Sequence, residues 1–416
     1  MDILLKPKPN SLGQRIGIIL FNIYIVIGYL ANDIVFPAIT NTIFLYLFIG
    51  YSAIYTFIKG IFKITTFTVW QIVFTIISII SLTYSPIEEV FDGQFYLCIV
   101  NLVLIYFLSR YEIDKQIFGK IAWSYTVGSA LLIAILIRSG NTIDSSGRLG
   151  TDLVGNANIL ATMLMVASIY AFWLLVYTKN SLWKKIILVG CVVLIYYGMF
   201  LSGGRKYILI PLIFLYIILF FKNDKKGRKH LLRNTIIVIA LVVLVFYTIM
   251  NVPALYDVIG QRMENLIYFI ETGQKLREGG AEDLRETMIE IGWHAWPESP
   301  LLGHGFDSFK YYNVQVTGRF FYSHNNFIEL LYNLGIIGFI VYYWFYIKMI
   351  ITGWDERNYK PQYATYFAIA LFISMLFYET GAINYSATTS FIIFYLSFAL
   401  LNKRYQKSSN CEGVVI

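Results

Sequence analysis

The sequence is poor in charged residues. Only 14% of its 416 residues are Asp, Glu, Lys or Arg, whereas an average soluble protein has about 25%. Hydrophobic residues make up 57% of the chain, and a soluble globule of this size would expose much of that apolar surface to water. This composition excludes an ordinary soluble enzyme, a disordered chain and a nucleic-acid-binding protein. It predicts an integral membrane protein.

The chain also lacks the residue patterns that hold metals and nucleotides. Its three cysteines are too few and too scattered for a disulfide framework or a metal-ligand cluster. The four histidines do not have the HExxH spacing of a zinc site, and the sequence has no P-loop, dinucleotide fingerprint or Asp-x-Asp pair. We therefore expect the protein to use no metal and no nucleotide cofactor.

Long hydrophobic runs dominate the sequence instead. A membrane-spanning helix needs about 20 mostly apolar residues, and the runs lack the period-2 alternation of a β-barrel. The predicted spans are residues 16–32, 41–58, 65–83, 94–109, 119–137, 157–177, 184–201, 207–221, 235–250, 326–347, 362–378 and 386–401. The predicted fold class is an all-α polytopic membrane protein, with residues 1–416 forming a single membrane domain.

Basic residues decide on which side of the membrane each connection lies. Cytoplasmic connections are enriched in Lys and Arg, and most of the 33 basic residues fall in every second connection, both terminal segments included. We predict that both termini lie in the cytoplasm and that residues 251–325 form one large extracytoplasmic loop. The basic run 222–233 is expected to contact anionic membrane lipids.

Four polar clusters are predicted to lie on the outer side: residues 148–158, 202–206, 283–309 and 323–338. In the second cluster, Arg205 could provide a fixed cation for a phosphate group, because its planar fork binds phosphate oxygens through two parallel bonds. The alternative is that Arg205 and Lys206 only extend to the lipid headgroups.

His324 is the candidate general base. It precedes a helix that Asn325 or Asn326 could cap, and the positive end of that helix disfavours a second proton on the imidazole. A general base must be neutral to accept a proton. The alternative is a surface histidine with a local hydrogen bond. We expect the other histidines to be structural or solvated, namely His230, His294 and His304.

The order and spacing of these clusters resemble the O-antigen ligase and O-antigen polymerase superfamily of bacterial surface polysaccharide assembly. Its members share this topology and a block similar to Pro-Leu-x-Gly-x-Gly, an aromatic residue, His-Asn and Gly-x-x-Gly. In this sequence the block reads Pro300-Leu-Leu-Gly303-His-Gly305, Phe309, His324-Asn325 and Gly335-Ile-Ile-Gly338. Gly204 stands where the upstream Ser-x-Ser-Arg motif often has its second serine.

The resemblance implies metal-independent, inverting glycosyl transfer at the outer face of the bacterial cytoplasmic membrane. The donor is a glycan on undecaprenyl diphosphate. Arg205 and Arg285 are implied to stabilise the leaving diphosphate, and His324 to accept the proton of the acceptor hydroxyl, with residues 251–325 as the catalytic loop. The residues implied to bind substrate are Arg148, Asn158, Ser202, Lys206, Gly303, Gly305, Asn325 and Glu329.

The resemblance leaves the acceptor open. A polymerase extends a growing lipid-linked glycan, whereas a ligase transfers the glycan to lipid A-core. The many Ile, Lys, Asn, Phe and Tyr residues suggest an AT-rich genome, which favours a capsule or exopolysaccharide polymerase. The resemblance further implies a chain-length regulator and a flippase as partners. The alternative from another class is a transporter. A transporter usually shows two related halves and ionisable residues near the bilayer midplane, and the sequence shows neither.

Overall fold

The structure is a computed structural model that describes residues 11–32, 35–62, 64–87, 93–139, 148–150, 156–222, 228–272 and 281–403. These residues are nearly all helical. The long helices are α1 (Leu12–Leu30), α2 (Ile39–Lys59), α3 (Thr66–Leu82), α4 (Gln94–Leu108), α5 (Lys115–Ser139), α7 (Ala157–Tyr177), α8 (Leu182–Ser202), α9 (Arg205–Lys222), α10 (Arg228–Asn251), α15 (Asn326–Asp355), α16 (Gln362–Glu379) and α17 (Thr388–Asn402). Between α10 and α15 lie α11 (Pro253–Leu255), α12 (Gln261–Thr272), α13 (Ala281–Ala295) and α14 (Phe309–Thr317).

Every predicted span coincides with one of the long helices, usually within a few residues at each end. Within the described residues, seven helices are long and apolar enough to cross a membrane, and α3, α4 and α17 are shorter apolar helices. The all-α fold class is therefore confirmed, and the chain is an integral membrane protein. The exact number of spans stays a prediction.

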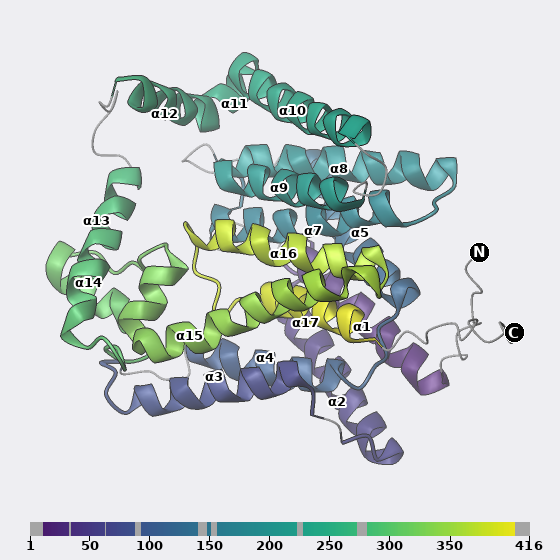
Figure 1. Ribbon diagram of the computed structural model, residues 1–416, viewed down its shortest axis with the longest axis horizontal. Helices are drawn as coiled ribbons and strands as arrows, with labels where there is room; N and C mark the ends of the chain where they lie inside the picture. The colour runs from purple at the N-terminus through teal and green to yellow at the C-terminus, as the bar shows by residue number, and fades with distance from the viewer. Residues whose placement is uncertain are drawn as a thin grey trace, which may run out of the picture.

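The bundle has a buried centre and exposed apolar edges. Most residues of α7, α16 and α17 are buried, as expected for helices that are apolar on all sides and lie inside a bundle. By contrast, α2 and α10 lie at two opposite edges of the bundle and bury little of their surface (Figure 1). Exposed apolar side chains on these edge helices fit contact with lipid.

Helices α13 and α14 lie at one end of the bundle, away from the first turn of α1 (Figure 1). Helix α13 packs closely on α15 because Gly292 has no side chain: a Cβ atom there would lie 2.4 Å from Ile328 Cγ2. Met288, on the same helix, is buried in a small apolar cluster with Phe309 and Tyr332. This packing fixes the position of Arg285, which lies one turn before Met288 on α13.

Helix α15 breaks at Gly335, whose φ of 62° and ψ of −168° are not helical. The segment 300–305 docks onto the backbone groups at the break. A Cβ atom on Gly335 would lie 2.3 Å from the Leu301 carbonyl oxygen, and one on Gly303 would lie 2.5 Å from the Asn333 backbone, so both positions require glycine. The docking bonds run from His304 N to Tyr332 O (2.8 Å), from Gly305 N to Asn333 O (2.9 Å), from Ile336 N to Pro300 O (2.9 Å) and from Ile337 N to Leu301 O (3.3 Å).

Candidate active site

A cavity of about 540 Å³ lies between the first turn of α7, helix α13 and the segment 317–324. It brings together four of the residues predicted from the sequence, which come from three polar clusters: Arg148, Asn158, Arg285 and His324. Arg319, which was not among the predicted residues, also lines it. None of the described residues that line the cavity is acidic, so the cavity carries positive charge and suits an anionic ligand.

Arg148 connects the first polar cluster to the second. Its Nε donates a hydrogen bond to the Ser202 carbonyl oxygen at 2.7 Å, and its Nη2 donates one to Asn158 Oδ1 at 3.0 Å. Asn156 caps α7 by accepting a hydrogen bond from the Asn158 backbone N–H at 2.8 Å. The first turn of α7 thus adds the positive end of a helix dipole to the cavity. Residues 151–155 of this cluster lie outside the described residues.

His324 has a left-handed backbone conformation, with a φ of 54°. A non-glycine residue pays about 1–2 kcal/mol for this conformation, so neighbouring bonds must hold it. The Ser323 hydroxyl donates to the Asn325 carbonyl at 2.9 Å, and the Ser323 N–H donates to Glu329 Oε2 at 2.9 Å. Asn325 caps α15, as predicted, by accepting hydrogen bonds from the N–H groups of Phe327 and Ile328.

The His324 imidazole is neutral at physiological pH. Burial, followed by the charges of Arg285 and Lys206, lowers the pKa of His324 to about 4. Burial and the two cations, more than the helix end considered from the sequence, therefore remove the proton. The imidazole forms no hydrogen bond to another described residue. It can accept a proton from a ligand in the cavity.

The charge of Lys206, at the end of the 202–206 turn, acts on His324. Its Nζ is buried without a hydrogen-bond partner and lies 5.0 Å and 5.2 Å from the ring centroids of Tyr207 and Tyr378. Burying an ammonium group without an anion costs free energy. The buried position also argues against the alternative that Lys206 extends to the lipid headgroups. Arg205 is the first residue of α9 and is not among the residues that line the cavity.

Six residues that the resemblance implied to bind substrate do not line the cavity: Ser202, Lys206, Gly303, Gly305, Asn325 and Glu329. Their direct contact with substrate stays a prediction. The buried Ser202 hydroxyl donates to the Met199 carbonyl at 2.7 Å, and the two glycines pack on other backbone segments. Glu329 has no exposed surface, and it holds the backbone of Ser323. These residues support those that line the cavity.

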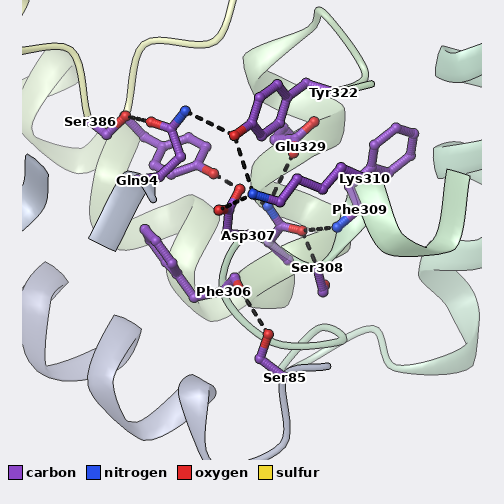
Figure 2. Close-up of polar contacts among 12 residues, drawn as sticks. Ser85, Gln94, Phe306, Asp307, Ser308, Phe309, Lys310, Tyr322, Glu329 and Ser386 are labelled. Carbon is purple, nitrogen blue, oxygen red and sulfur yellow. Dashed lines mark hydrogen bonds and ion pairs between the residues drawn. The ribbon is translucent and has the colours of Figure 1, made fainter. Parts of the chain in front are cut away.

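A second buried polar cluster, which the sequence did not reveal, fixes the segment before His324 (Figure 2). Lys310 Nζ lies 2.8 Å from Asp307 Oδ2 and 3.4 Å from Tyr322 Oη, which also accepts a hydrogen bond from Gln94 Nε2 at 3.2 Å. Burial raises the pKa of Asp307, and the bond to Lys310 opposes that rise. The cluster ties Tyr322, which lines the cavity, to the start of α4. The one sequence feature that could have indicated this cluster is an aspartate between two phenylalanines in the 306–309 segment.

The other histidines have the roles expected for them where the structure describes them. His304 Nε2 lies 3.1 Å from the Ala295 carbonyl oxygen, and its ring stacks on Tyr332 with centroids 4.4 Å apart. His294 is exposed at the end of α13. The His230 side chain lies outside the described part of the chain.

A family model described as O-antigen ligase matches residues 190–343. The matched region begins within α8 and ends within α15, so it includes the 202–206 turn, Arg285 and His324. No curated protein matches the chain. The family match confirms the resemblance and supports a role in glycan transfer during surface polysaccharide assembly. Residues 190–343 of this integral membrane protein thus match the O-antigen ligase family model, consistent with the O-antigen ligase and polymerase superfamily.

Proposed function

We propose that the protein polymerises undecaprenyl-diphosphate-linked oligosaccharide repeat units into a surface polysaccharide. The transfer is metal-independent and inverting, and it takes place at the outer face of the bacterial cytoplasmic membrane. The observation that carries this proposal is the cavity, in which a neutral His324 meets the fixed cations Arg148 and Arg285, with Lys206 close by. A diphosphate leaving group requires the cations, and an acceptor hydroxyl requires the base.

In the proposed reaction, the acceptor hydroxyl oxygen attacks the anomeric carbon of the donor sugar. His324 takes the hydroxyl proton as the new glycosidic bond forms, and the bond from the anomeric carbon to the diphosphate oxygen breaks. The diphosphate leaves with the electron pair of that bond and gains negative charge. Arg285 and Lys206 are already in place, so they stabilise this charge without reorganising, which lowers the barrier.

Donor binding also tunes the base. Arg285 and Lys206 are the two cations that lower the pKa of His324. A diphosphate bound beside them offsets their charge, and a nearby anion favours the protonated imidazole. A bound donor therefore raises the pKa of His324 by removing the part of the lowering that the two cations cause, while the part caused by burial remains. His324 becomes a stronger base only when there is a donor to react.

Ligase activity is the second candidate, because the matched family model is described as an O-antigen ligase. The same cavity chemistry serves both reactions, and the acceptor distinguishes them. A polymerase uses a lipid-linked glycan as the acceptor, whereas a ligase uses lipid A-core.

The test uses the purified full chain, lipid-linked repeat units from the cell that carries it, and excess EDTA. A ladder of products that differ by one repeat unit supports polymerisation. A single transfer that requires added lipid A-core supports ligation. Activity that disappears in EDTA and returns with magnesium or manganese contradicts the metal-independent reaction, and no transfer to either acceptor contradicts the proposed function.

We further propose that α13 and α14 lie outside and that both termini lie in the cytoplasm. Exposed positions allow a labelling test with a membrane-impermeant maleimide. Val316→Cys, on α14, should react in intact cells, whereas Lys120→Cys, on α5, should react only after permeabilisation. Both side chains are exposed and Cys98 and Cys191 are buried, and both variants also carry Cys411→Ser, which removes the third cysteine. Labelling of both positions in intact cells would contradict the orientation.

A further inference from the structure

Two exposed phenylalanines project into the cavity from the segment before His324. Phe320 and Phe321 line the cavity and remain 52% and 51% exposed. Large apolar side chains that are exposed together in a cavity usually mark a place where a ligand covers them. The diphosphate chemistry does not use them, because an anion gains nothing from an apolar ring.

The backbone of this segment is fixed, so the exposure belongs to the fold. Asn313 is fully buried, and its Nδ2 donates hydrogen bonds to the carbonyl oxygens of Arg319 at 2.9 Å and Phe321 at 3.1 Å. The Arg319 N–H donates to Thr317 Oγ1 at 3.3 Å. On the other side, Tyr322 is held by the Asp307 cluster shown in Figure 2. A binding surface that is fixed in advance loses little entropy when its ligand arrives.

The two phenylalanines differ in what they contact. The Phe320 ring packs edge-on against Tyr311, with centroids 5.1 Å apart, and Lys310 Nζ lies 5.4 Å from its centroid. Phe321 has no such aromatic or cationic neighbour in the described part of the chain. The face of the Phe321 ring is therefore free to contact a ligand in the cavity.

The chemistry around this face matches a sugar ring. A pyranose has a face of C–H groups, which packs on an aromatic ring, and a rim of hydroxyl or carboxylate groups, which bind the donors of a guanidinium. Arg319 is exposed, lines the same cavity and has no ion pair with a described residue. An isoprenoid tail would gain from Phe321 but would gain nothing from Arg319 or from the other polar groups of the cavity.

We propose that Phe321 and Arg319 form the subsite for the acceptor sugar. This inference rests on the proposed function and adds to it the place of the acceptor. The ring of the acceptor sugar stacks on Phe321 while Arg319 binds its polar groups. Its hydroxyl then points towards His324, three residues further along the same fixed segment. The subsite gives Phe321 and Arg319 a role in choosing which sugar is extended.

The test measures transfer with two substrates, using the purified full chain and a one-repeat oligosaccharide from the host's own polysaccharide as the acceptor. Phe321→Ala should raise the acceptor KM by about tenfold, the effect expected when roughly half of a phenylalanine side chain is no longer covered. Phe321→Tyr should keep the KM within about twofold. Inhibition by undecaprenyl diphosphate should be unchanged in Phe321→Ala but weaker in Arg285→Ala.

Trp293→Ala is the matched control, because Trp293 is 53% exposed on α13 and does not line the cavity. An acceptor KM that stays within about twofold in Phe321→Ala overturns the subsite, as does an equal rise in Trp293→Ala, which would indicate contact with lipid. If the wild-type protein transfers nothing, the proposed function fails. Direct titration of the oligosaccharide into the wild-type and Phe321→Ala proteins then still decides the subsite, because equal affinities contradict it.

Discussion

The cavity around His324 and the buried network around Glu379 are both polar, but they differ in how their ionisable groups are paired. Glu379 has no exposed surface, and its carboxylate accepts hydrogen bonds from Tyr342, Tyr343, Tyr346, Asn326 and Asn384. In the cavity region, by contrast, Lys206 Nζ is buried without a hydrogen-bond partner, and His324 forms no hydrogen bond to a described residue. The paired Glu379 carboxylate stabilises the fold, whereas the unpaired side chains of Lys206 and His324 are available to bind a ligand.

The two regions are connected. The network holds the chain that follows α16, where the Thr380 carbonyl accepts a hydrogen bond from Asn325 Nδ2 at 3.2 Å. A Cβ atom on Gly381 would lie 3.1 Å from Lys206 Nζ, so the same turn lies against the unpaired lysine. The five hydrogen bonds to the Glu379 carboxylate make its surroundings rigid, whereas an unsatisfied buried group costs free energy until a ligand pairs with it. Changes in the cavity should therefore reduce activity, and changes in the network should reduce stability.

The largest expected effect is at His324. His324→Ala removes the proposed base, and loss of a general base typically reduces the rate by about 10²–10⁴-fold. The free energy of unfolding should change little, because the imidazole has no hydrogen-bond partner to lose. Transfer assays and thermal unfolding in detergent measure the two quantities. His304→Ala is the control and should keep most activity; normal polymer from His324→Ala would contradict the assignment.

Lys206→Met tests whether the unpaired cation serves the donor. Loss of a charge-assisted contact of about 1.5–3 kcal/mol corresponds to roughly 10–100-fold lower activity. The variant should be at least as stable as the wild type, because methionine removes a buried unpaired charge and keeps most of the packing. The exposed Arg138 on α5 provides the control Arg138→Met, which should change neither quantity. A Lys206→Met protein that is active but less stable would show that Lys206 has a structural role and does not bind the donor.

The pH dependence of kcat/KM tests the neutral imidazole. Because the pKa of His324 is lowered to about 4, the base stays neutral at pH values where an ordinary histidine, with a pKa of about 6.5, is protonated. We expect kcat/KM for the donor, which reports the free enzyme, not to fall as the pH decreases through about 6 and to drop about tenfold per pH unit only below about 4. Arg285→Ala removes one lowering charge and should move the drop to higher pH. A drop centred near the ordinary value would contradict the geometry, provided that spectroscopy shows the protein still folded.

The smallest effect on activity is expected at Glu379. Glu379→Gln replaces an acceptor carboxylate with an amide whose NH₂ group faces donors, and an unsatisfied buried group costs about 1–3 kcal/mol. Thermal unfolding should show this loss, while activity at low temperature should fall by less than about tenfold. Glu290→Gln changes an exposed carboxylate on α13 and should change neither quantity. A stable but inactive Glu379→Gln protein would show that Glu379 takes part in the reaction and is not only structural.

The helices and the cap at Asn325 could be predicted because their signals are local. Apolar runs of spanning length and an Asn-Asn pair before such a run need no tertiary information. Arg285 and His324 could also be singled out, but only through the resemblance and the order of the polar clusters. The roles of Gly303 and Gly335 could not be predicted, because the reason for glycine at each is a backbone segment about 30 residues away.

What the sequence by itself determined is therefore the all-helical membrane fold and the set of polar residues from which a site could be built. The tertiary structure decided which of them line the cavity. Arg205 and Lys206 are neighbours in the sequence, yet a helix turns successive side chains by about 100°, and the packing of α9 buries the Lys206 ammonium group without a hydrogen-bond partner. Likewise Glu329 faces the interior and Arg319 faces the cavity. The position of Glu329 or Arg319 in the sequence does not determine which way its side chain points, because that direction depends on how separate helices pack together.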